Sequence, residues 1–260
     1  MKVFLRRIGA LVKLSLLELW RRNDVFTLLV LALVLLVPLS MARPFGASGA
    51  TRYFDEAALL LVWGYSLFIS LGIGGRLFAN EFASRTVYPL LAKPVSRGDL
   101  LLGKYLGAVA AAWSALAFFY ALWAVSSVLR GGECFSLCFL QAFVLHTVFV
   151  ALVVAAALCG SFMLSPSAST TLLAILFPAM FFFGRRLPEY AENVSGALKW
   201  LVNVMYVIAP HAEFFDMRQR LVHGWGEVQW WVFGWVVLYG LVYSFALLVF
   251  TRILFNRKRL

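Results

Sequence analysis

Long apolar stretches without charged residues alternate with short charged segments along this chain. Four such stretches are each close to 20 residues long or longer, and about 20 residues in a helix cross the hydrocarbon core of a bilayer. They are Val25–Met41, Ala57–Gly75, Tyr105–Leu129 and Val228–Thr251. A fifth stretch, Cys134–Gly184, is long enough for two helices joined at Ser165-Pro166-Ser167. The pattern therefore predicts six spans, at about 25–41, 57–77, 99–129, 135–163, 167–184 and 228–252.

The composition agrees with a membrane protein. Hydrophobic residues make up 63% of the chain and charged residues only 13%, whereas soluble domains carry about 25% charged residues. Inside a bilayer each backbone polar group must be satisfied within its segment, and the runs lack the alternation of barrel strands. We therefore expect an all-α polytopic protein that forms a single transmembrane domain over residues 1–260.

The basic residues predict the orientation. With the N-terminus in the cytoplasm, fifteen of the 23 Lys and Arg residues fall on the inner side, together with the whole formal net charge of +11. This bias is typical of cytoplasmic loops facing anionic lipid. We expect a multi-pass protein of the inner (plasma) membrane with both termini cytoplasmic, and the charge gives no reason to expect nucleic acid as a partner.

Two segments outside the spans have the pattern of surface helices. Residues 1–22 predict an amphipathic interfacial helix on the inner leaflet, with one apolar face. That face comprises Leu5, Ile8, Val12, Leu16 and Leu19. In the long outer loop 185–227, Ala197–Ala209 is short for a crossing, and we expect it to be interfacial or re-entrant. A seventh span there would move the basic C-terminus outside.

The connection between the second and third spans mixes charged and apolar residues. Thr86 and Pro94 suit the start and the end of a short amphipathic helix that lies parallel to the membrane. Ser96 and Asp99 then predict a capping box at the start of the third span. From these residues alone, an ordinary basic inner loop is an equal alternative.

This connection resembles the coupling region of type-2 ATP-binding-cassette permeases. The matching residues are Glu81, Thr86, Leu90, Leu91, Pro94, Ser96, Arg97, Gly103 and Lys104. The resemblance implies the permease subunit of an exporter, paired with a second permease subunit in a homodimer or heterodimer and docked on a cytoplasmic ATPase. It implies that the residues coupling the chain to that ATPase are Glu81, Arg85, Thr86, Leu90, Leu91, Lys93, Pro94, Ser96 and Arg97. ATP and Mg²⁺ would bind in the ATPase, and this chain would need no cofactor.

Several polar and aromatic residues in the spans are candidates for function. For the substrate pathway, which lipid contact would explain equally well, we select Tyr65 and Ser66 in the second span and Phe177 and Phe181 in the fifth. His146 and Gln141 are polar groups in hydrocarbon, and a hydrogen bond to another helix is the commoner role for such a histidine. Close helix packing is expected at Gly72, Gly74, Gly75, Gly103 and Gly107.

Two motifs suggest chemistry that their context does not support. Gly98–Lys104 reads G-x-x-x-x-G-K, but Tyr105 follows in place of Ser or Thr and no strand precedes it. In the outer loop, the spacing of His211, Glu213, Asp216 and His223 matches no zinc signature, so solvated or capping roles are expected.

Two other classes of protein remain as alternatives. A standalone secondary carrier would usually show ionisable residues at mid-membrane and an internal repeat. A membrane-embedded enzyme would need a motif such as HExxH or GxSxG, or a pair of intramembrane carboxylates. Neither pattern is evident, so we expect no catalytic residue and no metal site. The substrate stays open.

Overall fold

The computed structural model describes residues 2–21, 30, 33, 50–78, 96–129 and 136–257, and every regular element in them is a helix. The long helices are α3 (Ala50–Arg76), α6 (Arg97–Val128), α7 (Leu137–Met163), α8 (Pro166–Phe183) and α12 (Trp230–Arg257). In the described part of the chain, five helical stretches are long and apolar enough to cross a membrane. They match the second to sixth predicted spans. The first, at 25–41, lies outside the described residues.

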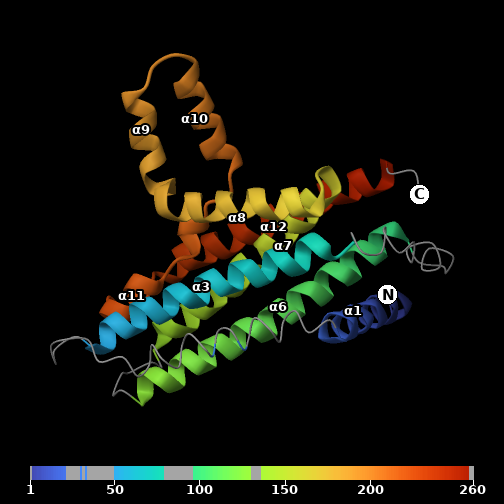
Figure 1. Cartoon of the computed structure of the whole chain (residues 1–260), viewed down its shortest axis with the longest axis horizontal. Helices are drawn as coiled ribbons and strands as arrows, with labels where there is room; N and C mark the ends of the chain where they lie inside the picture. Colours follow the sequence, from blue (N-terminus) through green and yellow to red (C-terminus); the bar gives the residue numbers. More distant parts are fainter. Residues whose placement is uncertain are drawn as a thin grey trace.

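Helix α7 lies at the centre of the bundle, with α3, α6, α8 and α12 around it (Figure 1). It is apolar on all sides and buried along most of its length, as expected of a central helix. In contrast, α12 is buried along one stripe only, formed by Gly240, Ser244, Leu248, Thr251 and Phe255. These residues recur every three or four positions and so share one face of the helix.

Two glycines allow α3 to approach its neighbours closely. A Cβ atom on Gly74 would lie 2.8 Å from the Cβ of Ala157 on α7, and one on Gly75 would lie 2.5 Å from Thr170 on α8. Both distances are too short for a side chain, which confirms the predicted close packing at these positions. At Gly72 the prediction is wrong, because nothing lies within 4 Å of the same point.

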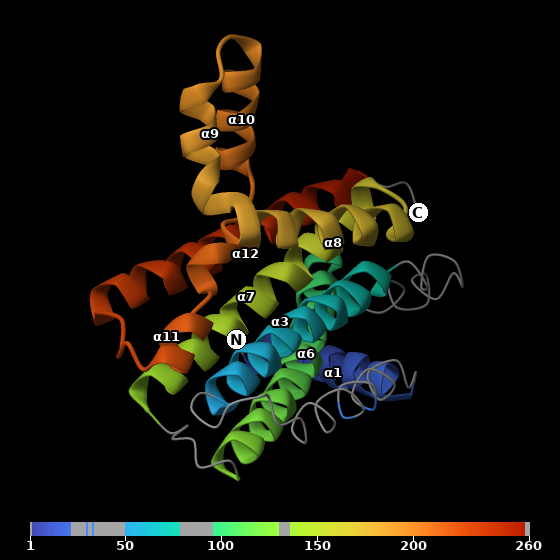
Figure 2. The ribbon, with the colours of Figure 1, turned by 60° about the vertical axis from the view of Figure 1, so that its left-hand side comes forward.

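Helix α1 (Lys2–Arg21) lies against the amino-terminal half of α6 in both views (Figures 1 and 2). A Cβ on Gly103 would lie 2.5 Å from the Cβ of Leu11, and one on Gly107 would lie 2.6 Å from that of Ser15. Leu11 and Ser15 are buried, whereas Val12, on the predicted apolar face, is half-buried. Residues Lys2–Arg21 are thus helical and pack on α6 through Leu11 and Ser15, a contact that the sequence did not predict. The position of α1 at the inner leaflet stays a prediction.

The predicted capping box at the start of α6 is confirmed. The Asp99 amide donates to Ser96 Oγ at 3.0 Å, and the Ser96 amide donates to Asp99 Oδ2 at 3.3 Å. Gly98–Lys104 is helical throughout, and the Lys104 ammonium lies 5.5 Å from the ring centroid of Phe78. This segment is therefore part of a membrane helix and forms no phosphate-binding loop.

The outer loop folds into five short helices. They are η1 (Gly184–Arg186), α9 (Leu187–Asn193), α10 (Ala197–Ile208), η2 (Ala212–Phe215) and α11 (Arg218–His223). Helices α9 and α10 form a hairpin that projects away from the bundle (Figures 1 and 2). With 12 residues, α10 is about 18 Å long and cannot cross a core of about 30 Å. The structure thus agrees with the short outer helix expected here and not with a seventh span.

Candidate functional site

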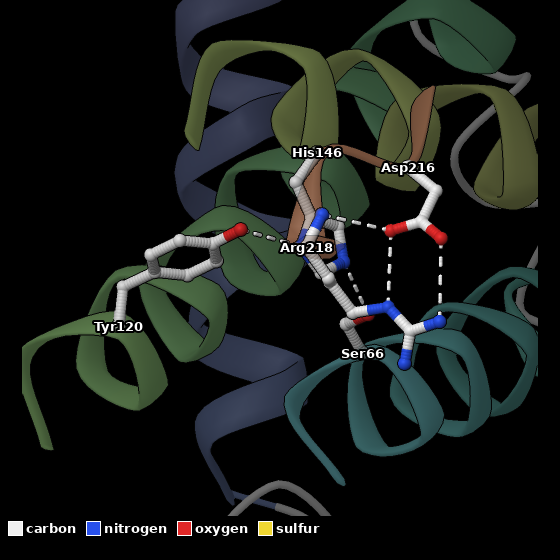
Figure 3. Close-up of polar contacts among 5 residues, drawn as sticks. All are labelled: Ser66, Tyr120, His146, Asp216 and Arg218. Carbon is white, nitrogen blue, oxygen red and sulfur yellow. Dashed lines mark hydrogen bonds and ion pairs between the residues drawn. The ribbon is translucent and has the colours of Figure 1, made fainter. Parts of the chain in front are cut away.

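His146 of α7 lies in a buried polar cluster with side chains of two neighbouring spans (Figure 3). Its Nε2 lies 2.7 Å from Ser66 Oγ on α3, and its Nδ1 lies 3.1 Å from the Tyr120 hydroxyl on α6. We call these three residues the His146 cluster. The hydrogen bond that was expected for His146 is confirmed, and it extends to two helices.

The hydrogen-bond pattern assigns the proton of the imidazole. The Ser66 hydroxyl donates to the carbonyl of Trp63 at 2.9 Å, so its single hydrogen is already used. It therefore accepts from Nε2–H of His146, and Nδ1 accepts from the Tyr120 hydroxyl. Both ring nitrogens are satisfied in the neutral form, which suits a cluster buried in a bilayer. The cluster joins α3, α6 and α7.

An ion pair from the outer loop lies beside this cluster (Figure 3). Arg218 Nε lies 3.0 Å from Asp216 Oδ1 and Nη2 lies 3.2 Å from Oδ2, a bidentate pairing. The guanidinium carbon also lies 4.7 Å from the ring centroid of Phe181. Both charges are mostly shielded from solvent, so the loop that carries them is held against α8 and the His146 cluster.

The residues predicted for the substrate pathway lie on two different sides of α3. Phe177 and Phe181 line an apolar groove of about 180 Å³ between α3 and α8, which also includes Trp63. Ser66 adjoins this side, because Trp63 stacks on His146 with ring centroids 4.7 Å apart. Tyr65 lies elsewhere, 5.9 Å from the ring of Phe119 on α6. Phe177 and Phe181 thus share one groove, and Ser66 lies next to Trp63 of that groove through its hydrogen bond to the Trp63 carbonyl.

The acidic and histidine residues of the outer loop do not converge on one point. His211 Nδ1 lies 3.0 Å from Glu213 Oε1, whereas Asp216 pairs with Arg218 as described above. His223 stacks on Trp225, with ring centroids 5.3 Å apart. Within the described residues, no group of three His, Cys, Asp or Glu side chains is placed to hold a metal ion.

Arg97, at the start of α6, contacts the end of α12. Its Nη1 donates to the carbonyl of Phe255 at 2.8 Å, and its guanidinium carbon lies 5.5 Å from the Phe255 ring. Arginine often satisfies the last carbonyls of a helix in this way. Of the predicted coupling residues, only Ser96 and Arg97 are described; Glu81, Arg85, Thr86, Leu90, Leu91, Lys93 and Pro94 lie outside the described residues.

The sequence-based selection missed Trp63, Tyr120 and Arg218. For Arg218 the sequence offered a weak indication, because an arginine beside apolar residues near the membrane needs an acidic or hydrogen-bonding partner. Tyr120 and Trp63 carry no signal of their own, because aromatic residues are common throughout apolar spans. Their roles follow from the way α3, α6 and α7 pack.

The sequence was compared with known protein families and with curated proteins. The model of the ABC-2 family transporter proteins matches residues 18–185, well over half of the chain. The matched region includes the first five predicted spans and the connection that resembles the coupling region. No curated protein shows significant sequence similarity to the chain. The chain therefore belongs to the ABC-2 family of transporter proteins and is a multi-pass transport permease.

Proposed function

We propose that the chain is the permease subunit of an ATP-driven exporter, working with a separate cytoplasmic ABC ATPase. The family match over residues 18–185 carries this proposal. ATP and Mg²⁺ bind in the ATPase. The segment of the permease from Glu81 to Arg97 docks on the ATPase and is displaced when the ATPase changes conformation. The basic bias of the inner segments supports placing both termini in the cytoplasm and the protein in the inner (plasma) membrane.

The inner end of α6 is suited to pass such movement on. The helix begins at Arg97, the last residue of the proposed coupling segment, and its first turn is fixed by the capping box. Arg97 contacts the end of α12, and Leu11 of α1 packs on Gly103. A displacement of the coupling segment therefore acts on α6 together with α1 and α12. It reaches the His146 cluster through Tyr120 on the same helix.

We propose that the face formed by α3 and α8 meets a second permease subunit and borders the substrate pathway. Leu172 and Ile175 of α8 and Phe68 of α3 are exposed apolar side chains. The groove that contains Phe177 and Phe181 lies between the same two helices. Apolar surface of this extent is covered either by lipid or by another protein, and a two-subunit exporter places its pathway between the subunits.

The test is reconstitution with the ATPase that co-purifies in mild detergent. Glu81→Gln should reduce permease-dependent ATP hydrolysis at least about tenfold, which corresponds to about 1.4 kcal/mol of lost coupling. Glu56→Gln is the matched control, because Glu56 is an exposed acid near the start of α3. It should leave hydrolysis unchanged. A chain that transports without any ATPase would contradict the proposal.

A further inference from the structure

A charged cavity of about 550 Å³ lies at the outer end of the bundle, between the end of α8 and the η2–α11 segment. Its charged lining residues come from two short stretches of the outer loop. They are Arg185, Arg186, Glu213, Asp216, Arg218 and Arg220. Four arginines against two carboxylates leave a formal excess of two positive charges. We call this cavity the outer arginine pocket.

Three of these arginines take no part in the ion pairs that the structure shows around the pocket. Asp216 pairs with Arg218, and Glu213 Oε1 lies 3.0 Å from His211 Nδ1. Among the residues that the structure describes, Arg185, Arg186 and Arg220 form no hydrogen bond or ion pair with a side chain. All three are exposed. Like charges around one cavity repel each other, and the outer side of a membrane protein generally carries fewer arginines than the inner side. Their convergence indicates an anionic ligand.

Glu213 gives the pocket a second polar feature. The residue is 3% exposed, and its Oε2 atom is buried with no hydrogen-bond partner. A Cβ atom on Gly184 would lie 2.6 Å from Oε1, so this glycine is what leaves room for the carboxylate. A buried carboxylate oxygen without a donor is costly. A ligand that brings a hydroxyl or ammonium group would remove that cost.

The rim of the pocket is aromatic. Phe182 and Trp225 both line it and are exposed. Tryptophan and other aromatic side chains are enriched at the membrane–water interface, where an apolar body meets polar headgroups. The pocket thus combines a cationic wall with an apolar edge at the end of a spanning helix.

We propose that the outer arginine pocket binds the phosphate ester of an amphiphile at the outer membrane surface. The forked guanidinium groups of Arg185, Arg186 and Arg220 match phosphate oxygens. Glu213 accepts a hydrogen bond from a hydroxyl or ammonium group next to the phosphate. The apolar chain of the ligand leaves past Phe182. This assignment does not depend on the coupling to an ATPase.

The proposal is tested on the purified full-length permease without ATPase or nucleotide. Native mass spectrometry would measure its binding of phosphatidylglycerol, of diacylglycerol and of inorganic phosphate. The test protein is the triple variant Arg185→Gln/Arg186→Gln/Arg220→Gln. The matched control is Arg52→Gln, because Arg52 is an exposed arginine at the start of α3 and does not line the pocket. Thermal melting shows whether each variant is folded. If the Gln variant is unfolded, the same three arginines are replaced by Lys, which keeps the positive charge but removes the forked guanidinium groups.

The wild-type and Arg52→Gln proteins should bind phosphatidylglycerol at least about tenfold more tightly than the triple variant, equivalent to about 1.4 kcal/mol. Diacylglycerol should bind both alike, because it lacks the phosphate. If inorganic phosphate binds as tightly as the lipid and needs the same arginines, the phosphate site stands and its source is a free anion. Equal phosphatidylglycerol affinity in the wild type and the folded triple variant would overturn the proposal.

Discussion

Gln141 of α7 and the backbone of Val228 are joined by two hydrogen bonds in opposite directions. The Val228 amide donates to Gln141 Oε1 at 2.8 Å, and Gln141 Nε2 donates to the Val228 carbonyl at 2.9 Å. Gln141 is 1% exposed, so it presents the complementary edge of its amide to a backbone that has not yet become helical. This pairing fixes the point at which the chain enters α12.

Replacing Gln141 by Ala should destabilise the protein. The Val228 amide and carbonyl would both lose their partners, at a cost of about 1–3 kcal/mol for each unsatisfied group. Gln229→Ala is the matched control, since the Gln229 side chain is exposed and accepts a hydrogen bond from the exposed Trp231 indole. Thermal unfolding in detergent measures both variants. Equal melting temperatures would contradict the role assigned to Gln141.

The His146 cluster predicts coupling between two substitutions. Tyr120→Phe and His146→Phe each remove the same hydrogen bond, so the second substitution should cost less in a protein that already carries the first. A double-mutant cycle should give an interaction energy of about 0.5–3 kcal/mol. Denaturant unfolding of the four proteins provides the cycle, and strictly additive costs would show that the two residues do not interact.

Two glycines predict opposite outcomes for the same substitution. Gly103→Ala places a methyl group against Leu11 and should cost about 1–3 kcal/mol by overpacking or separate α1 from α6. Gly72→Ala meets open space and should be neutral or favourable, because alanine is the better helix former. Limited proteolysis of residues 2–21 reports the docking of α1. Cleavage should increase in the Gly103 variant alone.

The contact between Arg97 and α12 predicts a local change in dynamics. Arg97→Gln removes a charge-assisted hydrogen bond to the Phe255 carbonyl, worth about 1.5–3 kcal/mol. Amide hydrogen exchange over residues 250–257 should then accelerate about tenfold or more. Arg257→Gln, at an exposed position on the same helix, should leave exchange in this segment unchanged. If both variants exchange as the wild type does, the contact has no stabilising role.

The spans were predictable because hydrophobicity and length alone decide them. The boundary at Ser165-Pro166-Ser167 is confirmed, since Ser165 caps α8 through its hydroxyl and Pro166 begins the helix. The capping box at Ser96 was equally accessible, because both of its partners lie within four residues. Such local features need no knowledge of the tertiary structure.

The candidate sites were only partly predictable, because they depend on contacts between distant residues. Gln141 and His146 stood out as polar groups in hydrocarbon, but their partners lie 87 and 80 residues away. The packing of α1 on α6 could not be predicted, because the hydrophobic pattern does not distinguish lipid from the surface of a neighbouring helix at Gly103 and Gly107. The outer arginine pocket has no motif at all, since its residues meet only after α8 and α11 fold together.

Helix α12 touches the bundle by one narrow stripe yet is held at both extremities. Gln141 forms two hydrogen bonds with Val228, just before the helix, and Arg97 donates a hydrogen bond to the Phe255 carbonyl in its last turn. Its 28 residues extend over about 42 Å, longer than the hydrocarbon core of about 30 Å. Both ends of this helix are thus fastened by side chains of other helices, Gln141 of α7 and Arg97 of α6, so a shift of α6 at Arg97 is expected to displace α12 as one body.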